Sequence, residues 1–309
     1  MKRWGLLTLL LGSLLSGSVA RAGTIFVVNS TAGTIGEYDT SGATVNASLI
    51  TGLNNPGSLT LSGSNLFVAN GGNTIGEYTT AGGTVNAALI TGLNNVHQVS
   101  SFGSDIFVAN GNPTNTIGEY TTAGATVNSA LISGVDVAHG AASNGSDIFV
   151  LNNGSGSLGS GSISEYNTSG GLVNGALITG LSTPEEIVII GSDIFVTNFG
   201  LGTAATGTVG EYTTSGTTVN ASLISGLDGP GGIATDGTYL FITNGFGGTI
   251  SEYTTSGVLV NAALVSGLSA PDGITVFGTA TPEPGCFGLL TVAALGAFGF
   301  SRRKLAFRS

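Results

Sequence analysis

The side chains best suited to chemistry in this chain lie at equivalent positions of a repeated sequence pattern, where the chain enters the first strand of each repeat. Both histidines of the protein occupy this position in adjacent repeats, and carboxylates occupy it in two other repeats. The resulting set is His97, His139, Glu185 and Asp272. Two imidazoles together with carboxylates suit a transition metal such as Zn²⁺. We therefore predict this set as a divalent metal site. The alternative is that the four are ordinary polar residues at solvent-facing turns.

Three further acidic residues lie close to this position in the sequence and are weaker candidates for the same site: Glu186, Asp136 and Asp236. The chain contains no recognisable nucleophile–base arrangement, which favours a non-enzymatic role over catalysis. The single cysteine, Cys286, lies in an apolar segment near the C-terminus, so no intramolecular disulfide forms.

The elements that position these residues belong to a repeat used six times. Its most regular part is a Glu-Tyr pair, and consecutive tyrosines of the pair are 40, 42, 46, 46 and 41 residues apart. These tyrosines are Tyr38, Tyr78, Tyr120, Tyr166, Tyr212 and Tyr253. A period of this length with four strands in each unit is typical of β-propeller blades.

Four strands are predicted in each repeat, as the second repeat illustrates. Residues 58–62, 66–69, 74–80 and 84–90 are rich in Val, Ile, Thr, Phe and Tyr, with Gly, Asn, Ser and Asp between them. The second of these strands is apolar on both faces, as expected of a strand between neighbouring blades. Helical periodicity is absent from the repeats.

The phase of the repeat predicts that the ring closes on itself. The first repeat begins at a second strand, residues 25–29, and the last repeat ends with an unpartnered first strand, residues 272–277. Together these fragments complete one blade, whereas an open solenoid would leave a large sheet edge exposed. We predict an all-β, six-bladed propeller of four-stranded blades. First strands line the central channel, so the predicted metal set would surround one of its mouths.

The body resembles the NHL/YVTN class of propellers. The resemblance rests on a Pro-x-Gly-Ile motif combined with a Phe-Val-x-Asn strand and an Ile-x-Glu-Tyr strand, and the motif stands at Pro230-Gly231-Gly232-Ile233 and Pro271-Asp272-Gly273-Ile274. The class includes ligand-binding modules, structural proteins, lyases and lactonases, and some of its lyases hold a metal in the channel. Asn stands in all six repeats where the class usually has Asp at the end of the second strand.

The N-terminus has the pattern of a signal peptide. Lys2 and Arg3 precede an apolar segment, residues 6–15, and small residues then allow cleavage after Ala22. The alternative is a retained membrane anchor or a buried helix. The predicted organisation is a signal peptide at 1–22, the propeller at 23–279 and a tail at 280–309, with a short apolar helix at each end.

The C-terminal tail combines three elements in order. Pro282-Glu283-Pro284 precedes an uncharged apolar run, residues 286–300, and a basic cluster follows it: Arg302, Arg303 and Lys304. Fifteen residues are marginal for crossing ~30 Å of hydrocarbon, and the basic cluster would stop transfer on the cytoplasmic side. The order resembles the PEP-CTERM sorting signal of Gram-negative bacteria. The resemblance implies transient inner-membrane anchoring, processing by an exosortase-type enzyme, and display or release at the cell surface, often among exopolysaccharides. The alternative is a plain C-terminal anchor.

Charge limits the partners of the body. All seven Lys and Arg residues lie at the two ends, and of the 17 acidic residues only Glu283 lies in the tail, which leaves sixteen (17 − 1) in the body. Nucleic acid and anionic lipid headgroups are therefore disfavoured partners. Divalent cations, neutral glycans and cationic surfaces remain.

The predicted function follows from the tail and from the near-identical blades. We expect an exported propeller that acts as a binding or structural module in the envelope or exopolysaccharide matrix, with a glycan or matrix protein as its partner. The alternative is a channel-mouth metalloenzyme of NHL type, a lyase or lactonase. A purely structural matrix role is the third hypothesis, and it predicts no saturable ligand.

Overall fold

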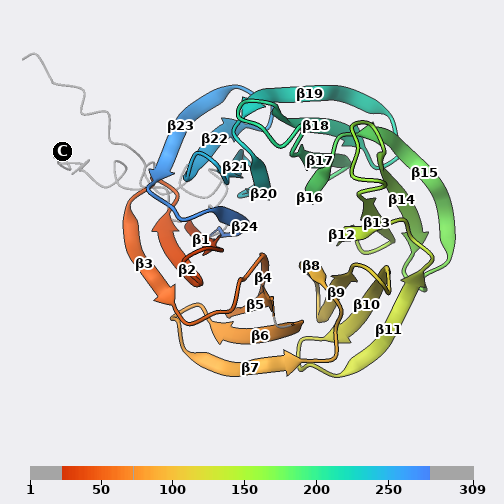
Figure 1. The fold of residues 1–309 in the computed structure, drawn as a ribbon, viewed down its shortest axis with the longest axis horizontal. Helices are drawn as coiled ribbons and strands as arrows, with labels where there is room; N and C mark the ends of the chain where they lie inside the picture. Colours follow the sequence, from red (N-terminus) through yellow and green to blue (C-terminus); the bar gives the residue numbers. More distant parts are fainter. Residues whose placement is uncertain (1–22, 72, 279–309) are drawn as a thin grey trace, which may run out of the picture. The chain divides into compact units, whose positions relative to one another are not determined.

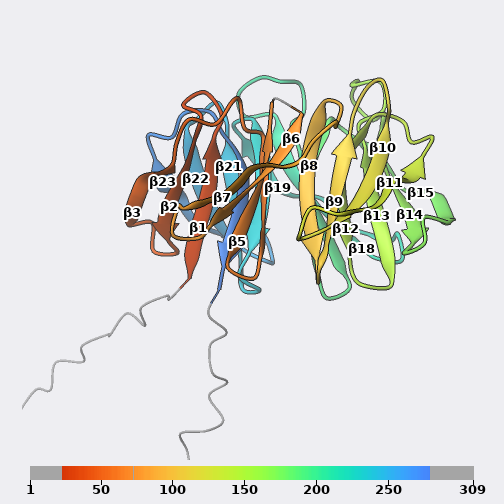
Figure 2. The same cartoon turned by 90° about the horizontal axis from the view of Figure 1, so that it is seen from below.

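The computed structural model describes residues 23–71 and 73–278, and these form six four-stranded antiparallel sheets. The sheets are arranged as blades around a central channel (Figure 1). Figure 2 shows the ring from the side, with the strands running between its two faces.

Each blade has an inner strand at the channel and a second strand beside it. The inner strands are β24 (Pro271–Phe277), β4 (Ser58–Ser62), β8 (Val96–Phe102), β12 (Ala138–Ser143), β16 (Pro184–Ile190) and β20 (Pro230–Thr235). The second strands are β1 (Thr24–Asn29), β5 (Asn65–Asn70), β9 (Asp105–Asn110), β13 (Asp147–Asn152), β17 (Asp193–Asn198) and β21 (Tyr239–Asn244).

The third and fourth strands complete each blade towards the rim. The third strands are β2 (Thr34–Asp39), β6 (Thr74–Thr79), β10 (Thr116–Thr121), β14 (Gly161–Asn167), β18 (Gly207–Thr213) and β22 (Thr249–Thr254). The fourth strands are β3 (Thr44–Ile50), β7 (Thr84–Ile90), β11 (Thr126–Ser133), β15 (Leu172–Leu181), β19 (Thr218–Leu227) and β23 (Leu259–Ser266).

The hydrophobic core lies between blades rather than inside any one of them. The second strands are buried on both faces, as their uninterrupted apolar sequences predict. At one interface Tyr78 of β6 packs among Phe26 and Ile35 of the preceding blade and Leu66 of its own. Six such clusters occupy the six interfaces between described blades. The repeated tyrosine therefore joins each blade to the one before it.

The ring closes as the phase of the repeat predicts. β24 pairs antiparallel with β1, with Ile25 opposite Val276 and Phe26 opposite Thr275. A core cluster that includes Ile25 and Phe241 joins this shared blade to the blade of β20–β23. The prediction of a six-bladed all-β propeller closed by strands from both ends is confirmed. The predicted terminal helices, the signal peptide and the sorting tail lie outside the described residues.

The repeated asparagines make local hydrogen bonds. At the end of a second strand, the side chain of Asn29 accepts a hydrogen bond from the Ser269 amide, and Asn110 and Asn198 bond in the same way to the loops that enter their own blades. In every outer strand the Asn side chain accepts a 3.1 Å bond from the amide two residues on, beginning with Asn46 and Ser48. These contacts give the repeated asparagines a structural role. Within residues 23–71 and 73–278 there is no helix of the length and apolar character needed to cross a membrane.

Candidate functional site

A repeated backbone irregularity aims the candidate residues at the channel. In five inner strands the register with the second strand slips by one residue just after the first pairing, as between Val96 and Val99 of β8. Such a β-bulge adds an unpaired residue and redirects side chains. The inner strand β4 starts its ladder without one.

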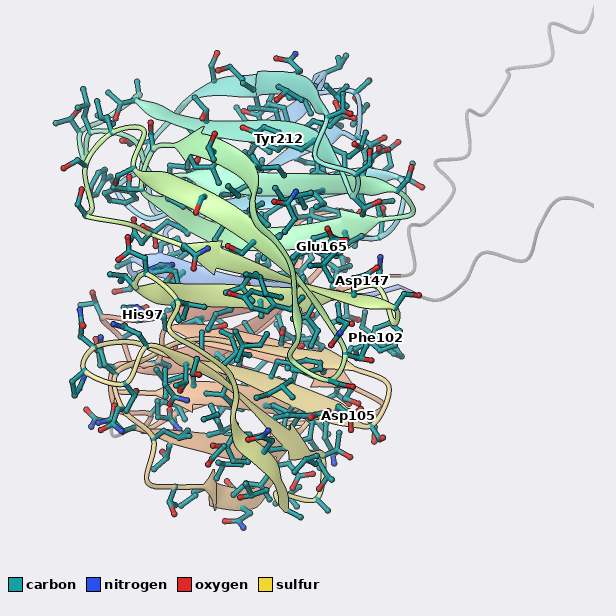
Figure 3. All side chains as sticks on the ribbon, turned by 90° about the vertical axis from the view of Figure 1, so that its right-hand side faces the viewer. His97, Phe102, Asp105, Asp147, Glu165 and Tyr212 are labelled. Carbon is teal, nitrogen blue, oxygen red and sulfur yellow. The ribbon has the colours of Figure 1, made fainter. Side chains whose placement is uncertain are left out.

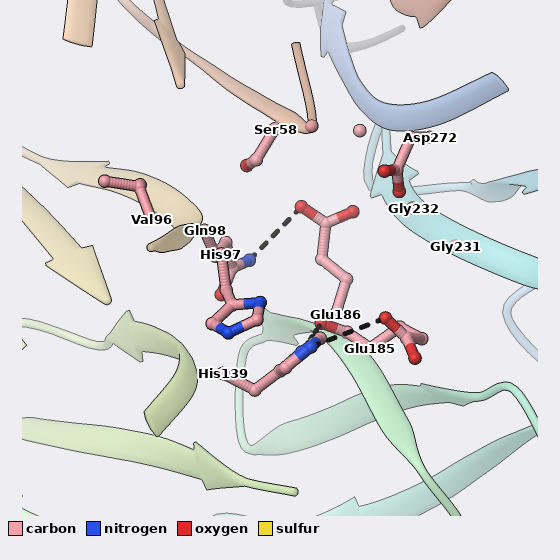
Figure 4. Close-up of a pocket in the computed structure, with 12 residues that line it drawn as sticks. Ser58, Val96, His97, Gln98, His139, Glu185, Glu186, Gly231, Gly232 and Asp272 are labelled. Atoms are coloured by element: carbon pink, nitrogen blue, oxygen red, sulfur yellow. Dashed lines mark hydrogen bonds and ion pairs between the residues drawn. The ribbon is translucent and has the colours of Figure 1, made fainter. Parts of the chain in front are cut away.

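Two tiers of residues result at this mouth of the channel. The outer tier consists of Gly57, His97, His139, Glu185, Gly231 and Asp272. The inner tier is formed by the next residue in each strand: Ser58, Gln98, Gly140, Glu186, Gly232 and Gly273. All of them except Gly140 line, together with Val96, one cavity of about 150 Å³, which we call the mouth pocket (Figure 4). The structure thus brings the four predicted site residues together.

The mouth lies at one face of the ring. Figure 3 shows His97 at that face and Phe102, at the other end of β8, towards the opposite face. The predicted equivalence of these positions in different repeats explains the convergence, because in five blades the start of the inner strand pairs with the Asn that ends the second strand. Val96 pairs with Asn110, and Pro184 pairs with Asn198.

The two histidines are neutral and lie against each other. Their ring centroids are 4.5 Å apart and the rings are tilted by 30°. Burial, and then the nearby His139, lower the pKa of His97 to about 4. Burial lowers the pKa of His139, although its bond to the Glu185 carbonyl opposes that shift. Neither ring therefore carries a charge at neutral pH.

Hydrogen bonds fix which nitrogen of each ring carries the proton. The Nδ1–H of His139 donates to the Glu185 carbonyl oxygen at 3.1 Å, so its Nε2 has a free lone pair, 3.7 Å from a Glu185 carboxyl oxygen. The Nε2 of His97 accepts from the Asn95 side-chain amide at 3.0 Å. The His139 Nε2 is the basic nitrogen available in the pocket.

A polar bridge crosses the channel beneath the histidines. The side chain of Gln98 donates to Glu186 at 3.2 Å and accepts from the Ala141 amide at 3.0 Å. The other carboxyl oxygen of Glu186 accepts from the Ile233 amide at 2.8 Å. Since these residues belong to four consecutive blades, the bridge fastens them together and separates the mouth pocket from the channel below.

Three carboxyl groups in the pocket hold protons unusually tightly. Burial raises the pKa of Glu185 to about 7. Burial and the nearby Glu185 raise the pKa of Asp272 to about 7. Burial raises the pKa of Glu186 to about 8, despite hydrogen bonds from Ile233 and Gln98 that act in the opposite direction. Functional sites commonly contain several carboxyl groups with shifted pKa values in one cavity.

The metal assignment stays a prediction. As they are placed, the described residues include no group of three or more His, Cys, Asp or Glu side chains able to hold a metal ion. Of the weaker candidates, Glu186 lines the mouth pocket. Asp136 is exposed in the loop before β12 and does not line it. Asp236 is at the opposite end of β20, where it accepts hydrogen bonds from Thr238 and Tyr239.

A second cavity adjoins the mouth pocket and was not predicted from the sequence. Its volume is about 360 Å³ and it shares Glu185, Gly231 and Asp272 with the mouth pocket. Its aromatic wall is formed by Phe199 and Phe246, whose rings meet edge to face at 5.3 Å, and we call this pair the phenylalanine shelf.

The sequence did carry a signal for the shelf. Four second strands are followed by Ser, Gly, Gly and Asn, but Phe199 follows Asn198, and Phe246 comes two residues after Asn244. Deviation from a repeat is where a local function is expected. Gln98 was also missed, because a glutamine beside a histidine is unremarkable until the bridge to Glu186, 88 residues away, is seen.

Comparison with known proteins establishes the fold. No protein family profile and no curated protein matches this chain. A chain of a nidogen/laminin complex superposes with a TM-score of 0.66 at 12% identity, covering 82% of this chain and 98% of that one. A catalytically inactive virginiamycin B lyase from Staphylococcus aureus, crystallised with quinupristin, gives 0.57 at 17% identity, covering 81% and 84%. A gluconolactonase from Xanthomonas campestris gives 0.56 at 10% identity, covering 72% and 82%. At these identities the likeness is one of fold alone.

Proposed function

We propose that this protein is an exported β-propeller that binds a ligand at the mouth pocket and serves as a binding module in the bacterial envelope or exopolysaccharide matrix. The observation that carries the proposal is the gathering of both histidines and three carboxyls, one buried and two partly buried, at one mouth of an otherwise repetitive ring. Stability alone does not require such a group, because burying carboxyls without cationic partners is costly.

Binding is tested with the purified protein on an array of glycans and matrix proteins, followed by titration of any hit. We expect saturable binding that the double variant Glu185→Gln/Asp272→Asn loses. The control, Asp136→Asn, changes an exposed carboxylate outside the pocket and should bind normally. A complete absence of saturable ligands would favour the purely structural role and overturn the proposal.

Export and sorting are supported by the ends of the sequence. The signal peptide with cleavage after Ala22 and the order Pro282-Glu283-Pro284, apolar run and basic cluster are the features that motivate it. We expect surface or secreted protein in cell fractions of a host with an exosortase-type enzyme, and retention in the inner membrane when Pro282, Glu283 and Pro284 are replaced by Ala. Identical fractionation of both proteins would contradict sorting at this motif.

A second candidate function is a channel-mouth metalloenzyme of lyase or lactonase type. The free lone pair of the His139 Nε2 beside the Glu185 carboxyl favours it, since a base next to a protonatable carboxyl suits proton transfer. Two of the proteins of similar fold are a lyase and a gluconolactonase by name. As they are placed, the described side chains do not form a three-ligand group for a metal.

Metal analysis of the purified protein separates the two candidates. A stoichiometric transition metal that is lost in the His97→Ala/His139→Ala double variant would favour the enzyme. Retention of the metal in that variant would remove the predicted set as its ligands. Absence of a metal, together with saturable ligand binding, favours the binding module.

A further inference from the structure

The phenylalanine shelf and the mouth pocket are two halves of one cavity system. The cavity walled by the phenylalanine shelf, which we call the shelf pocket, shares Glu185, Gly231 and Asp272 with the mouth pocket. Gly231 lies between the two carboxyls in the outer tier, and a Cβ built on it would lie 2.8 Å from a carboxyl oxygen of Asp272. The missing side chain therefore leaves the passage between the two compartments open.

The shelf is fastened to the loops that enter β16, which carries Glu185, and β20, which carries Gly231. The Phe199 amide donates to the Thr183 carbonyl, just before β16, and the Phe246 amide donates to the Asp228 carbonyl, just before β20. Gly229 has a left-handed backbone, and a Cβ there would lie 2.8 Å from the Phe246 ring. The close approach of ring and backbone holds Phe246 over the loop, although the side chain remains 56% exposed. An exposed aromatic in a fixed position is a ready contact surface.

Among the described residues that line it, the cavity beside the phenylalanine shelf has acidic side chains and no basic ones. The ionisable side chains that line the shelf pocket are carboxyls, and the described residues contain no Lys or Arg to neutralise them. The one hydroxyl in the shelf pocket, on Ser30, already donates to the Pro56 carbonyl oxygen at 2.7 Å. The cavity therefore offers acceptors and π faces, and what it lacks is a cation that donates hydrogen bonds.

From this complementarity we infer that the ligand of the mouth pocket is a ring-bearing primary ammonium, of the kind a glycan with free amino sugars carries. The ring lies on Phe246 and Phe199, and the ammonium group sits between Glu185 and Asp272. A neutral sugar would leave the carboxyl pair uncompensated, and a simple ammonium ion would leave the shelf empty. The inference rests on the proposed binding function and names its ligand class.

Calorimetric titration of the purified protein with a glucosamine trimer tests the inference, with the N-acetylated trimer, a glucose trimer and methylammonium as probes. We expect the free-amine trimer to bind at least about tenfold more tightly than each of the others, and Asp272→Asn and Phe246→Ala each to weaken it about tenfold or more. The matched control is Phe102→Ala, which removes a 45% exposed phenylalanine at the far end of β8 (Figure 3).

The outcomes separate this inference from the proposed function. Equal or tighter binding of a neutral trimer, lost in Asp272→Asn, would overturn the ammonium ligand and keep the mouth pocket as a binding site. Binding of the amine trimer that survives both Asp272→Asn and Phe246→Ala would show charge attraction elsewhere on the acidic surface and would overturn the inference. Failure of every ligand, including those of the array, would overturn the proposed function itself.

Discussion

At the scale of single residues, Glu186 is the clearest departure from the repeat. Where the other blades have Ser, Gln or Gly, it places a carboxyl across the channel, 9% exposed, with Gln98 and Ile233 donating to it. Its neighbours in the pocket, Glu185 and Asp272, are also acidic. The folded protein therefore holds protons here that an unfolded chain would release, which links the stability of the fold to pH.

The sign of this linkage follows from the pKa values. Glu186 has a folded pKa of about 8 against an ordinary value of 4.5, so its contribution to stability falls as pH rises between these values, and Glu185 and Asp272 act alike up to about 7. The lowered pKa values of His97 and His139 act in the opposite direction, but only below about 6.5. Above pH 6.5, of these five groups only the three carboxyls make the stability of the fold depend on pH.

We therefore expect the free energy of unfolding to fall by on the order of 1 to 3 kcal/mol between pH 6.5 and 8. In Glu186→Gln this fall should shrink, because the amide does not titrate. The variant should also be less stable at pH 6 by about 1 kcal/mol, since the amide nitrogen cannot accept the bond that one carboxyl oxygen accepts. Denaturant titrations at several pH values measure both effects, and equal slopes against pH in the two proteins would refute the assignment.

At the scale of elements, the bulged starts of the inner strands decide what the channel mouth contains. A bulge repeated in five of the six blades makes the outer-tier and inner-tier positions available, and glycines leave room where a neighbour's side chain crosses. Gly140 is the sharpest example, because a Cβ built there would overlap the side-chain oxygen of Gln98. The bridge across the channel thus depends on a glycine in a different blade.

Gly140→Ala should destabilise the fold by about 1 to 3 kcal/mol, because Gln98 has to leave its position and break its bonds to Ala141 and Glu186. In the double variant with Gln98→Ala, the added cost of Gly140→Ala should largely vanish, since the overlap is gone. Thermal or denaturant unfolding of the four proteins measures this coupling.

Gly57→Ala is the matched control, because a Cβ at Gly57 would meet no atom closer than 3.9 Å. We expect it to change stability by less than about 0.5 kcal/mol. Additive costs of the Gly140 and Gln98 changes would mean that the overlap is relieved without moving Gln98.

At the scale of the whole ring, closure rests on one blade built from both ends of the described chain. β24 covers the inner edge of β1 and contributes Ile274 to the core cluster shared with the neighbouring blade. It also carries Asp272 into the mouth pocket. Loss of this strand would expose a sheet edge and remove one wall of the candidate site.

A chain that ends at Ala270 should therefore unfold at a temperature at least several degrees lower than one that ends at Gly278, and it should associate through the exposed edge of β1. Calorimetry and size-exclusion chromatography measure these properties. The chain ending at Gly278 is the control, because it keeps β24 and lacks only residues 279–309. Equal melting temperatures would show that the ring does not depend on its closing strand.

The sequence by itself determined the blades, their number and the way the ring closes. Strand patterns, turn residues and the spacing of the Glu-Tyr pairs are local, and they repeat six times, so each copy confirms the others. The equivalence of His97, His139, Glu185 and Asp272 could be predicted for the same reason, since it is a matter of alignment between repeats.

Only the tertiary structure decided what these positions do together. The bridge from Gln98 to Glu186, the stacked imidazoles and the phenylalanine shelf join residues from different blades, which no local pattern relates. The raised pKa values of the carboxyls depend on burial, which exists only once the ring has formed. Local sequence fixes strand and phase because backbone pairing and alternation are short-range, whereas convergence and desolvation at the mouth are properties of the closed ring.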